Sequence, residues 1–319
     1  MVFGMMTAVN EYVGYLKEVK KIMKMVKYKN GNYTVIRDLD SGTLIKMNDL
    51  DFLDAAFPDS FDLKITNCCD MGCKFCHENS LPEGKHGNIM NAKFINTLHP
   101  YTEIAIGGGN PLEHPDLIPF LKKLKSLKMI PNMTINQVHF MKNQELIKYL
   151  IDNKLIYGLG VSLVSANESF INKISKYPNA VIHVINGVHP VKELKKLYDK
   201  GLKLLILGYK EFRRGKDYYS NKVIESESEL YINLEDLVKH FKVVSFDNLA
   251  LKQLNPKRLL TEEEYNKYYM GADGQSTCYV DLVEKTYSVS SVSPLEERFA
   301  LLDDIKPMFS HIKQICSGK

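Results

Sequence analysis

Between Phe61 and Leu207 the chain alternates short strand-like runs with amphipathic helix-like runs. Each unit is about 25–30 residues long. The strand-like runs span residues 61–67, 103–106, 132–138, 156–163, 180–185 and 202–207. The helix-like runs between them span residues 91–98, 115–128, 143–153, 167–175 and 190–200. Strands joined by helices pair in parallel through right-handed crossovers. The pattern therefore predicts an α/β fold, a (β/α)6 partial TIM-like barrel.

Both ends of the chain depart from this alternation. Apolar side chains at helical spacing predict an amphipathic N-terminal helix, and β-branched residues around an Asp-Ser-Gly turn predict a hairpin. Near the C-terminus we expect a further strand, a hairpin turning at Glu284-Lys285 and a closing helix. The N-terminal helix spans residues 9–26 and the first hairpin residues 33–47. The further strand, the second hairpin and the closing helix span residues 243–246, 277–292 and 303–316. We expect an N-terminal appendage, a barrel and a C-terminal extension packed on it, over residues 1–58, 59–250 and 251–319.

The composition is that of a globular protein, with 45% hydrophobic and 25% charged residues. The sequence has no run of about 18 apolar residues and no signal-peptide pattern, so we expect a cytoplasmic protein without membrane contact. The net charge of +4 lies in residues 1–30, which hold six Lys and two Glu. The remaining 36 basic and 36 acidic residues balance, which gives no electrostatic reason to expect nucleic acid.

Four of the six cysteines lie within nine residues, directly after the first strand-like run. The cysteines are Cys68, Cys69, Cys73, Cys76, Cys278 and Cys316. A secreted disulfide scaffold would be shorter and would spread its cysteines, so this clustering indicates a metal site. We interpret the two isolated cysteines as incidental or buried residues.

Cys69, Cys73 and Cys76 follow the spacing Cys-x3-Cys-x2-Cys. Thiolates are soft ligands that suit Fe–S clusters and zinc. Structural zinc needs four ligands, and His77 is the nearest candidate for the fourth. A [4Fe–4S] cluster held by three cysteines would instead leave one iron open to another ligand. We assign Cys68 to packing, because adjacent residues on an extended backbone point to opposite sides.

A second motif follows the next strand-like run. Residues 107–115 read Gly-Gly-Gly-Asn-Pro-Leu-Glu-His-Pro. Glycines allow the backbone to approach a ligand closely, although such a run is also typical of a strand-to-helix turn. Both motifs follow neighbouring strands, so we expect both at the C-terminal edge of the sheet. Barrel enzymes have their active sites at this edge.

The cysteine spacing, Phe75 directly before the last cysteine and the glycine motif together resemble the signatures of the radical S-adenosylmethionine (radical SAM) superfamily. The resemblance covers residues 60–250. It implies a [4Fe–4S] cluster on Cys69, Cys73 and Cys76 whose fourth iron binds SAM. Reductive cleavage of SAM would give a 5′-deoxyadenosyl radical that abstracts hydrogen from a substrate, with electrons from a donor such as flavodoxin or ferredoxin.

The resemblance also implies a set of residues around SAM. They are Phe75 beside the adenine, Gly108, Gly109 and Asn110 at the amino group, Ser162 in the fourth strand and Asn186 at the end of the fifth. Asn110 stands where the superfamily usually has Glu. Its amide oxygen can accept a hydrogen bond from an ammonium but adds no charge.

The sequence assigns no catalytic residue and leaves the substrate open among a peptide, a nucleotide and a small metabolite. The reaction subclass (oxidoreductase, lyase or transferase) is open as well. Residues 77–87 could contact substrate or form a solvated loop. Arg213 and Arg214 could bind an anion or be solvated, and Asn136 and Gln137 could face the barrel interior or solvent. The alternative function is a non-catalytic zinc or iron–sulfur binding protein.

Overall fold

The computed structural model describes residues 25–40, 43–50 and 52–318. The chain forms two compact units, one ending at Ala56 and the other beginning at Phe57. Among the described residues, no helix has both the length and the apolar composition that crossing a bilayer requires.

The first unit contains a three-stranded antiparallel sheet in the order β1-β2-β3. Its strands are β1 (Met25–Asn30), β2 (Tyr33–Asp38) and β3 (Leu44–Met47). Pairing of β2 with β3 confirms the predicted hairpin. The helix expected over residues 9–26 is wrong at its end, because Met25 and Val26 begin β1 and pair with Asp38 and Arg37. The rest of that helix prediction lies outside the described residues.

The second unit contains a ten-stranded sheet. Seven strands lie side by side in chain order and each pair of neighbours is parallel, which confirms the predicted α/β fold. They are β4 (Ser60–Thr66), β5 (Glu103–Gly108), β6 (Ile130–Asn136), β7 (Gly158–Ser162), β8 (Ala180–Ile185), β9 (Lys203–Leu207) and β10 (Val243–Phe246). The sheet thus extends beyond the six predicted β/α units.

The C-terminal segment extends the same sheet at its other edge. Strand β11 (Thr277–Asp281) pairs in parallel with β4, the first strand of the unit. Strands β12 (Thr286–Ser288) and β13 (Phe299–Ala300) continue the sheet in antiparallel order. The predicted hairpin is confirmed, with Lys285 at φ +55° in its turn.

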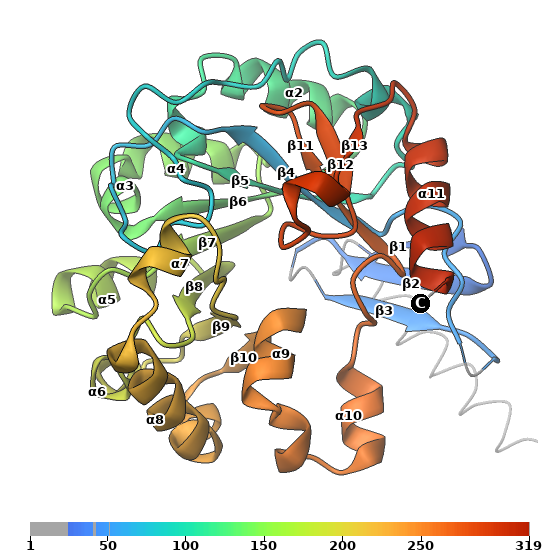
Figure 1. The fold of residues 1–319 in the computed structure, drawn as a ribbon. Coiled ribbons are helices and arrows are strands. Elements are labelled where there is room, and N and C mark those ends of the chain that lie inside the picture. Colours follow the sequence, from blue (N-terminus) through green and yellow to red (C-terminus); the bar gives the residue numbers. More distant parts are fainter. Residues whose placement is uncertain (1–24, 41–42, 51, 319) are drawn as a thin grey trace, which may run out of the picture. The chain divides into compact units, whose positions relative to one another are not determined.

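Helices cover the outer face of this curved sheet (Figure 1). The α-helices of the unit are α2 (Leu117–Ser126), α3 (Gln137–Lys142), α4 (Gln144–Asp152), α5 (Glu168–Ile174), α6 (Val191–Leu194), α7 (Arg214–Tyr218), α8 (Asn221–Leu237), α9 (Asn248–Leu254), α10 (Glu262–Tyr268) and α11 (Ile305–Ser317). The helix expected over residues 91–98 is only a 3-10 turn, η1 (Lys93–Thr97). A second 3-10 turn, η2 (Pro111–Glu113), follows the glycine motif.

The two faces of the sheet differ in chemistry. Side chains that point toward the helices are apolar and buried, as in Ile104, Met133, Val161 and Ile182. The opposite face is polar or small over β4 to β7 and includes Lys64, Thr66, Asn132, Thr134 and Gly160, with His183 of β8 beside them. Gly160 makes room there, because a Cβ at this position would lie 2.4 Å from the His183 ring. The other residues of this face on β8 and the middle and end of β9 are apolar, namely Val181, Ile185, Leu205 and Leu207. The inner face of the sheet is therefore polar near β4 to β7 and largely apolar along β9.

The third predicted strand is wrong at its end. Strand β6 ends at Asn136, and Gln137 begins α3. The Asn136 side chain accepts a hydrogen bond from the Val138 amide and so caps the helix. The Gln137 side chain is buried and bonds to the backbone of Val164 and Ser165. Both polar residues thus serve local structure.

Candidate active site

The cysteine loop and the glycine motif meet at the C-terminal ends of β4 and β5. The Gly109 amide donates to the Thr66 carbonyl at 2.8 Å, and the Asn110 amide donates to the Cys68 carbonyl at 2.7 Å. A Cβ on Gly109 would lie 2.2 Å from the Cys68 carbonyl oxygen. Gly108 has φ +112°, and a Cβ there would lie 2.3 Å from the Thr66 carbonyl oxygen. These two glycines are therefore needed for the contact between the loops.

Gly107 differs from its two neighbours. A Cβ there would meet nothing within 4 Å. Its position on β5 is next to Lys64 of β4. The glycine motif thus borders an open space at Gly107, at the same edge of the sheet as the cysteine loop.

The thiols of Cys69, Cys73 and Cys76 are free and half-buried. Within the described residues, their sulfur atoms do not form a set that all lie within 4.8 Å of one another. A tetrahedral zinc with bonds of about 2.3 Å would bring its sulfurs to about 3.8 Å from one another. The three sulfur atoms are therefore spaced more widely than in such a zinc site.

Burial raises the pKa of the Cys69 thiol, and the neighbouring thiols Cys73 and Cys76 add to the effect. Burial and Cys76 also raise the pKa of Cys73, while the nearby positive charge of Arg214 opposes the shift. Binding to a metal centre would favour the thiolate forms of these cysteines.

Cys68 has different surroundings from the other three. It is buried, and its thiol lies 3.0 Å from the Pro82 carbonyl oxygen and 3.2 Å from Glu113 Oε2. Burial and the bond to Glu113 raise the pKa of Cys68 to about 11. Cys68 is therefore a neutral thiol engaged in hydrogen bonds within the protein.

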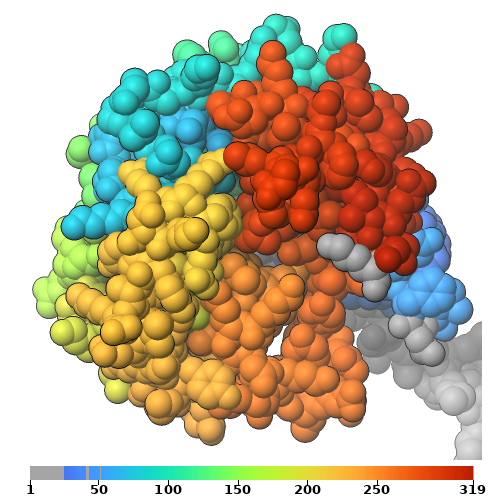
Figure 2. Space-filling model, viewed as in Figure 1, coloured from blue at the N-terminus to red at the C-terminus, as the bar shows by residue number. Residues whose placement is uncertain are grey.

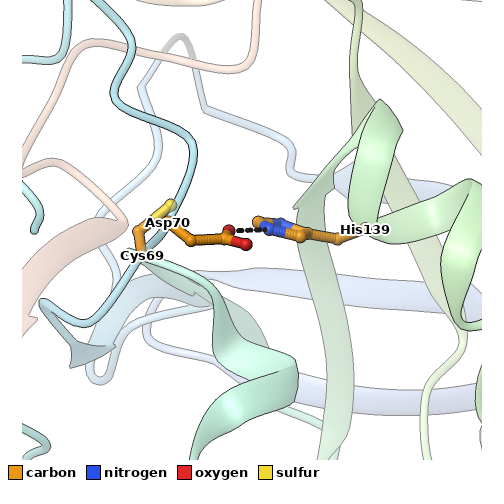
Figure 3. Close-up of side chains that lie close together, drawn as sticks. All are labelled: Cys69, Asp70 and His139. Atoms are coloured by element: carbon orange, nitrogen blue, oxygen red, sulfur yellow. Dashed lines mark hydrogen bonds and ion pairs between the residues drawn. The ribbon is translucent and has the colours of Figure 1, made fainter. Parts of the chain in front are cut away.

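Asp70 and His139 connect the cysteine loop to α3 (Figure 3). His139 is buried, and its Nε2 lies 2.6 Å from Asp70 Oδ1. This hydrogen bond lowers the pKa of the Asp70 carboxyl. The Cys69 sulfur lies within 4.8 Å of ligand atoms of both residues. The pair therefore holds the loop in place directly beside the first cysteine of the motif.

Asn110 is almost fully buried, and hydrogen bonds fix its amide. The Oδ1 atom accepts from the Leu112 amide at 3.3 Å, and the Nδ2 atom donates to Glu113 Oε1 at 3.1 Å. The Glu113 carboxylate thus connects Asn110 to Cys68, one residue before the motif.

A buried charge cluster lies under the cysteine loop. Lys64 Nζ lies 2.7 Å from Glu78 and 3.2 Å from Asp281, and all three side chains are at most 10% exposed. Burial opposes ionisation of Glu78, but His77 and Lys64 hold its pKa below the usual value. His77 Nε2 lies 3.3 Å from Glu78 Oε1 and 3.2 Å from Lys210 Nζ. These contacts engage one of the two ring nitrogens through which His77 could bind zinc.

Arg213 and Arg214 hold the segment after β9 against the cysteine loop. Arg213 donates to the Glu78 carbonyl at 2.9 Å, and Arg214 donates to the Ser80 carbonyl at 2.6 Å. Figure 2 shows this yellow segment in contact with the cyan segment that follows the cysteines. Neither side chain is the solvated charge that one interpretation of the sequence expected.

The other expected SAM contacts lie on separate elements. The Phe75 ring packs edge-on against Tyr218, with the centroids 5.8 Å apart. Ser162 ends β7, between Asn136 of β6 and His183 of β8 in the sheet register. Asn186 follows β8 and is almost fully buried in a pocket with Glu227 and Gln253.

Several residues of this site were not predicted from the sequence, including Lys64, Asp70, Glu113 and His139. Lys64 gave one signal, because a lysine between Leu63 and Ile65 in a buried strand needs a partner. The sequence pattern did not indicate the partners of Asp70 and Glu113. Only the fold brings Asp70 to His139 and Glu113 to Cys68.

No family model matches this sequence, and no curated protein matches it either. The structure is similar to that of SuiB from Streptococcus suis. SuiB bound to the precursor peptide SuiA gives a TM-score of 0.55 at 12% identity, covering 84% of this chain and 82% of that one. SuiB bound to S-adenosylmethionine gives 0.56 at 11% identity, covering 86% and 84%. At this identity the likeness concerns the fold alone. The chain therefore has the fold of SuiB, a protein that was also solved with S-adenosylmethionine, the ligand that the two motifs imply.

Proposed function

We propose that the chain is a radical SAM enzyme whose Cys69, Cys73 and Cys76 bind a [4Fe–4S] cluster. When bound, the cluster and SAM supply a 5′-deoxyadenosyl radical that abstracts hydrogen from the substrate. One observation carries the proposal: the cysteine loop is hydrogen-bonded to the glycine motif at the C-terminal edge of a parallel sheet. The SAM-bound structure of SuiB, which has the same fold, supports it.

In this proposal the chain's own residues bind the cofactors and orient the cysteine loop. Asp70 and His139 fix the cysteine loop from one side. Arg213 and Arg214 fix the segment after the cysteines from another. A loop held in this way presents its thiols with little motion, which favours a defined cluster position.

SAM occupies the open space at Gly107 in this proposal. Its amino group lies by Gly108, Gly109 and Asn110, its adenine by Phe75, and a polar end by Ser162. Because Asn110 adds no charge, the nearest carboxylate of the motif is Glu113, which bonds to Asn110. The electron donor would be a flavodoxin or ferredoxin.

A peptide is the substrate class that we favour. SuiB, which has the same fold, was solved with a precursor peptide. The polar part of the sheet's inner face, with Asn132, Thr134 and His183, offers hydrogen-bonding groups that suit a peptide backbone. A nucleotide and a small metabolite are the alternatives.

The experiment is anaerobic reconstitution followed by iron and sulfide analysis and by SAM cleavage under a strong reductant. We expect about four irons per chain and formation of 5′-deoxyadenosine. Cys69→Ala should lose the cluster and the activity. Cys68→Ala is the matched control and should keep both, because its thiol bonds to Pro82 and Glu113.

The rival function is non-catalytic zinc binding. The proximity of Cys69, Asp70 and His139 is the observation in its favour. Zinc that stays bound after reconstitution, with no iron and no 5′-deoxyadenosine, would establish this rival and contradict the radical SAM proposal. Loss of the cluster in Cys68→Ala instead of Cys69→Ala would contradict our assignment of the ligands.

A further inference from the structure

We propose that a pocket beside the cysteine loop binds an organic cation, the ammonium or guanidinium group of a lysine or arginine side chain. The pocket has a volume of about 410 Å³ and lies between the end of β8, helix α8 and helix α9. Its lining includes Asn186, Glu211, Tyr219, Glu227, Tyr231 and Gln253. That the cation belongs to a peptide substrate rests on the proposed function.

Asn186 provides an acceptor that lacks a donor. Gln253 is fixed by two bonds to the Tyr209 backbone, because its Oε1 accepts from the amide and its Nε2 donates to the carbonyl. Gln253 Oε1 in turn accepts from Asn186 Nδ2 at 3.1 Å, which sets the orientation of the Asn186 amide. Asn186 Oδ1 is then buried with no hydrogen-bond partner among the described residues. A buried acceptor without a donor is costly, and a donor group in the pocket would satisfy it.

Two carboxylates give the pocket its charge. Glu211 and Glu227 line it, and neither forms an ion pair in the described part of the chain. Burial raises the pKa of Glu227, and the negative charge of Glu211 adds to this shift. The nearby Arg258 lies over the Tyr231 ring at 4.1 Å and donates to the Tyr231 carbonyl. The pocket therefore has unneutralised negative charge beside an unsatisfied acceptor.

The rest of the lining favours an organic cation over a metal ion. The side chains of Tyr219, Tyr231 and Ile232 add apolar and aromatic surface that suits an alkyl stem and a cation. A calcium or magnesium ion needs six or more oxygens at about 2.0–2.6 Å, which fits poorly in a space of this volume. A lysine or arginine side chain supplies both the donor for Asn186 and the charge for the carboxylates.

The pocket adjoins the proposed reaction site. Tyr219 lines it, and the preceding residue, Tyr218, packs against Phe75 of the cysteine loop. Asn186 follows the C-terminal end of β8, at the same edge of the sheet as the cysteines. A basic side chain held here would place the neighbouring part of a peptide near the cluster. In this proposal Asn186 binds the cation and not the adenosyl group.

Equilibrium dialysis tests the pocket with the full chain carrying its reconstituted cluster. The probes are N-acetyl-lysine methylamide and N-acetyl-arginine methylamide, with N-acetyl-norleucine methylamide as the uncharged control. We expect the cationic probes to bind at least roughly tenfold more tightly than the norleucine probe. Glu211→Gln and Glu227→Gln should each weaken the cationic probes roughly fivefold. Glu225 is exposed on α8, the helix of Glu227, but lies outside the pocket, so Glu225→Gln should have no effect.

Glu211 is exposed, so its variant tests the pocket without endangering the fold. Equal binding of the norleucine probe, or unchanged binding after both Gln substitutions, would overturn the proposal. Displacement of the lysine probe by CaCl2 beyond the effect of NaCl at equal ionic strength would identify a metal site instead. SAM cleavage is measured separately. A chain that cleaves SAM but ignores the cationic probes contradicts the pocket alone, and the reverse result contradicts the proposed function alone.

Discussion

The three consecutive glycines have different surroundings, although the sequence presents them as one run. Gly108 and Gly109 face the backbone of the cysteine loop at distances that no Cβ tolerates. Gly107 faces open space. The first two are therefore required by the protein itself, and the third borders the space that SAM fills in the proposed function.

This difference predicts opposite effects of two matched substitutions. Gly109→Ala should lower the free energy of unfolding by about 1–3 kcal/mol, because its Cβ would collide with the Cys68 carbonyl. Gly107→Ala should leave stability within about 0.5 kcal/mol and should weaken SAM binding, because SAM fills that space in the proposed function. Chemical denaturation and SAM titration measure the two effects. Equal stability of both variants would contradict the role given to Gly109.

Strand β4 connects the cysteine loop to the C-terminal strand β11 through one buried lysine. Lys64 is 2% exposed and contacts Glu78 after the cysteines and Asp281 at the end of β11. Arg298 also lies near Asp281, at 3.5 Å. A buried charge is tolerated only when it is paired, so these elements depend on one another.

Lys64→Met should therefore lower the free energy of unfolding by about 3–5 kcal/mol, because it leaves Glu78 and Asp281 with too little positive charge. Lys93→Met is the matched control, since Lys93 pairs with Asp303 where both side chains are exposed. It should leave stability nearly unchanged. Chemical denaturation compares the two variants. A Lys64 variant as stable as the control would mean that the buried charge cluster contributes nothing to the free energy of unfolding.

The elements differ in how well the sequence predicted them. Strands β8 and β10 have the predicted bounds, and α4 and α11 are within two residues of them, because their apolar periodicity is clear. Helix α8 was not predicted, since charged residues dominate its exposed face. The two motifs identified the cysteine loop and its neighbour. The contacts around them, such as Asp70 with His139, join residues far apart in the chain and could not be read from local pattern.

On the scale of the second unit, its first strand lies beside a strand from the C-terminal segment. Strand β4 begins at Ser60, and its partner β11 ends at Asp281. The sheet register joins Lys64 directly to Asp281. The C-terminal segment therefore adds strands β11, β12 and β13 to the sheet beside β4, the strand that the cysteine loop follows.

A chain ending at Ser276 should lack these strands and aggregate, because it exposes the edge of β4 and leaves Lys64 without Asp281. It also loses α11, whose Ile305, Met308, Phe309 and Ile312 are buried. A chain ending at Cys316 is the control and should stay folded. Size-exclusion chromatography and circular dichroism distinguish the outcomes. A folded, monodisperse shorter chain would show that β11 is dispensable.

The pairing of β4 with β11 also sets an order of events during synthesis. The cysteine loop leaves the ribosome more than two hundred residues before Asp281 does. Until then, Lys64 has only Glu78 as its buried partner and β4 has an open edge. For most of translation, the three thiols therefore follow a strand that has not yet paired with β11. In the proposed function, insertion of a cluster into a stable site would therefore follow the synthesis of β11 rather than that of the cysteine loop.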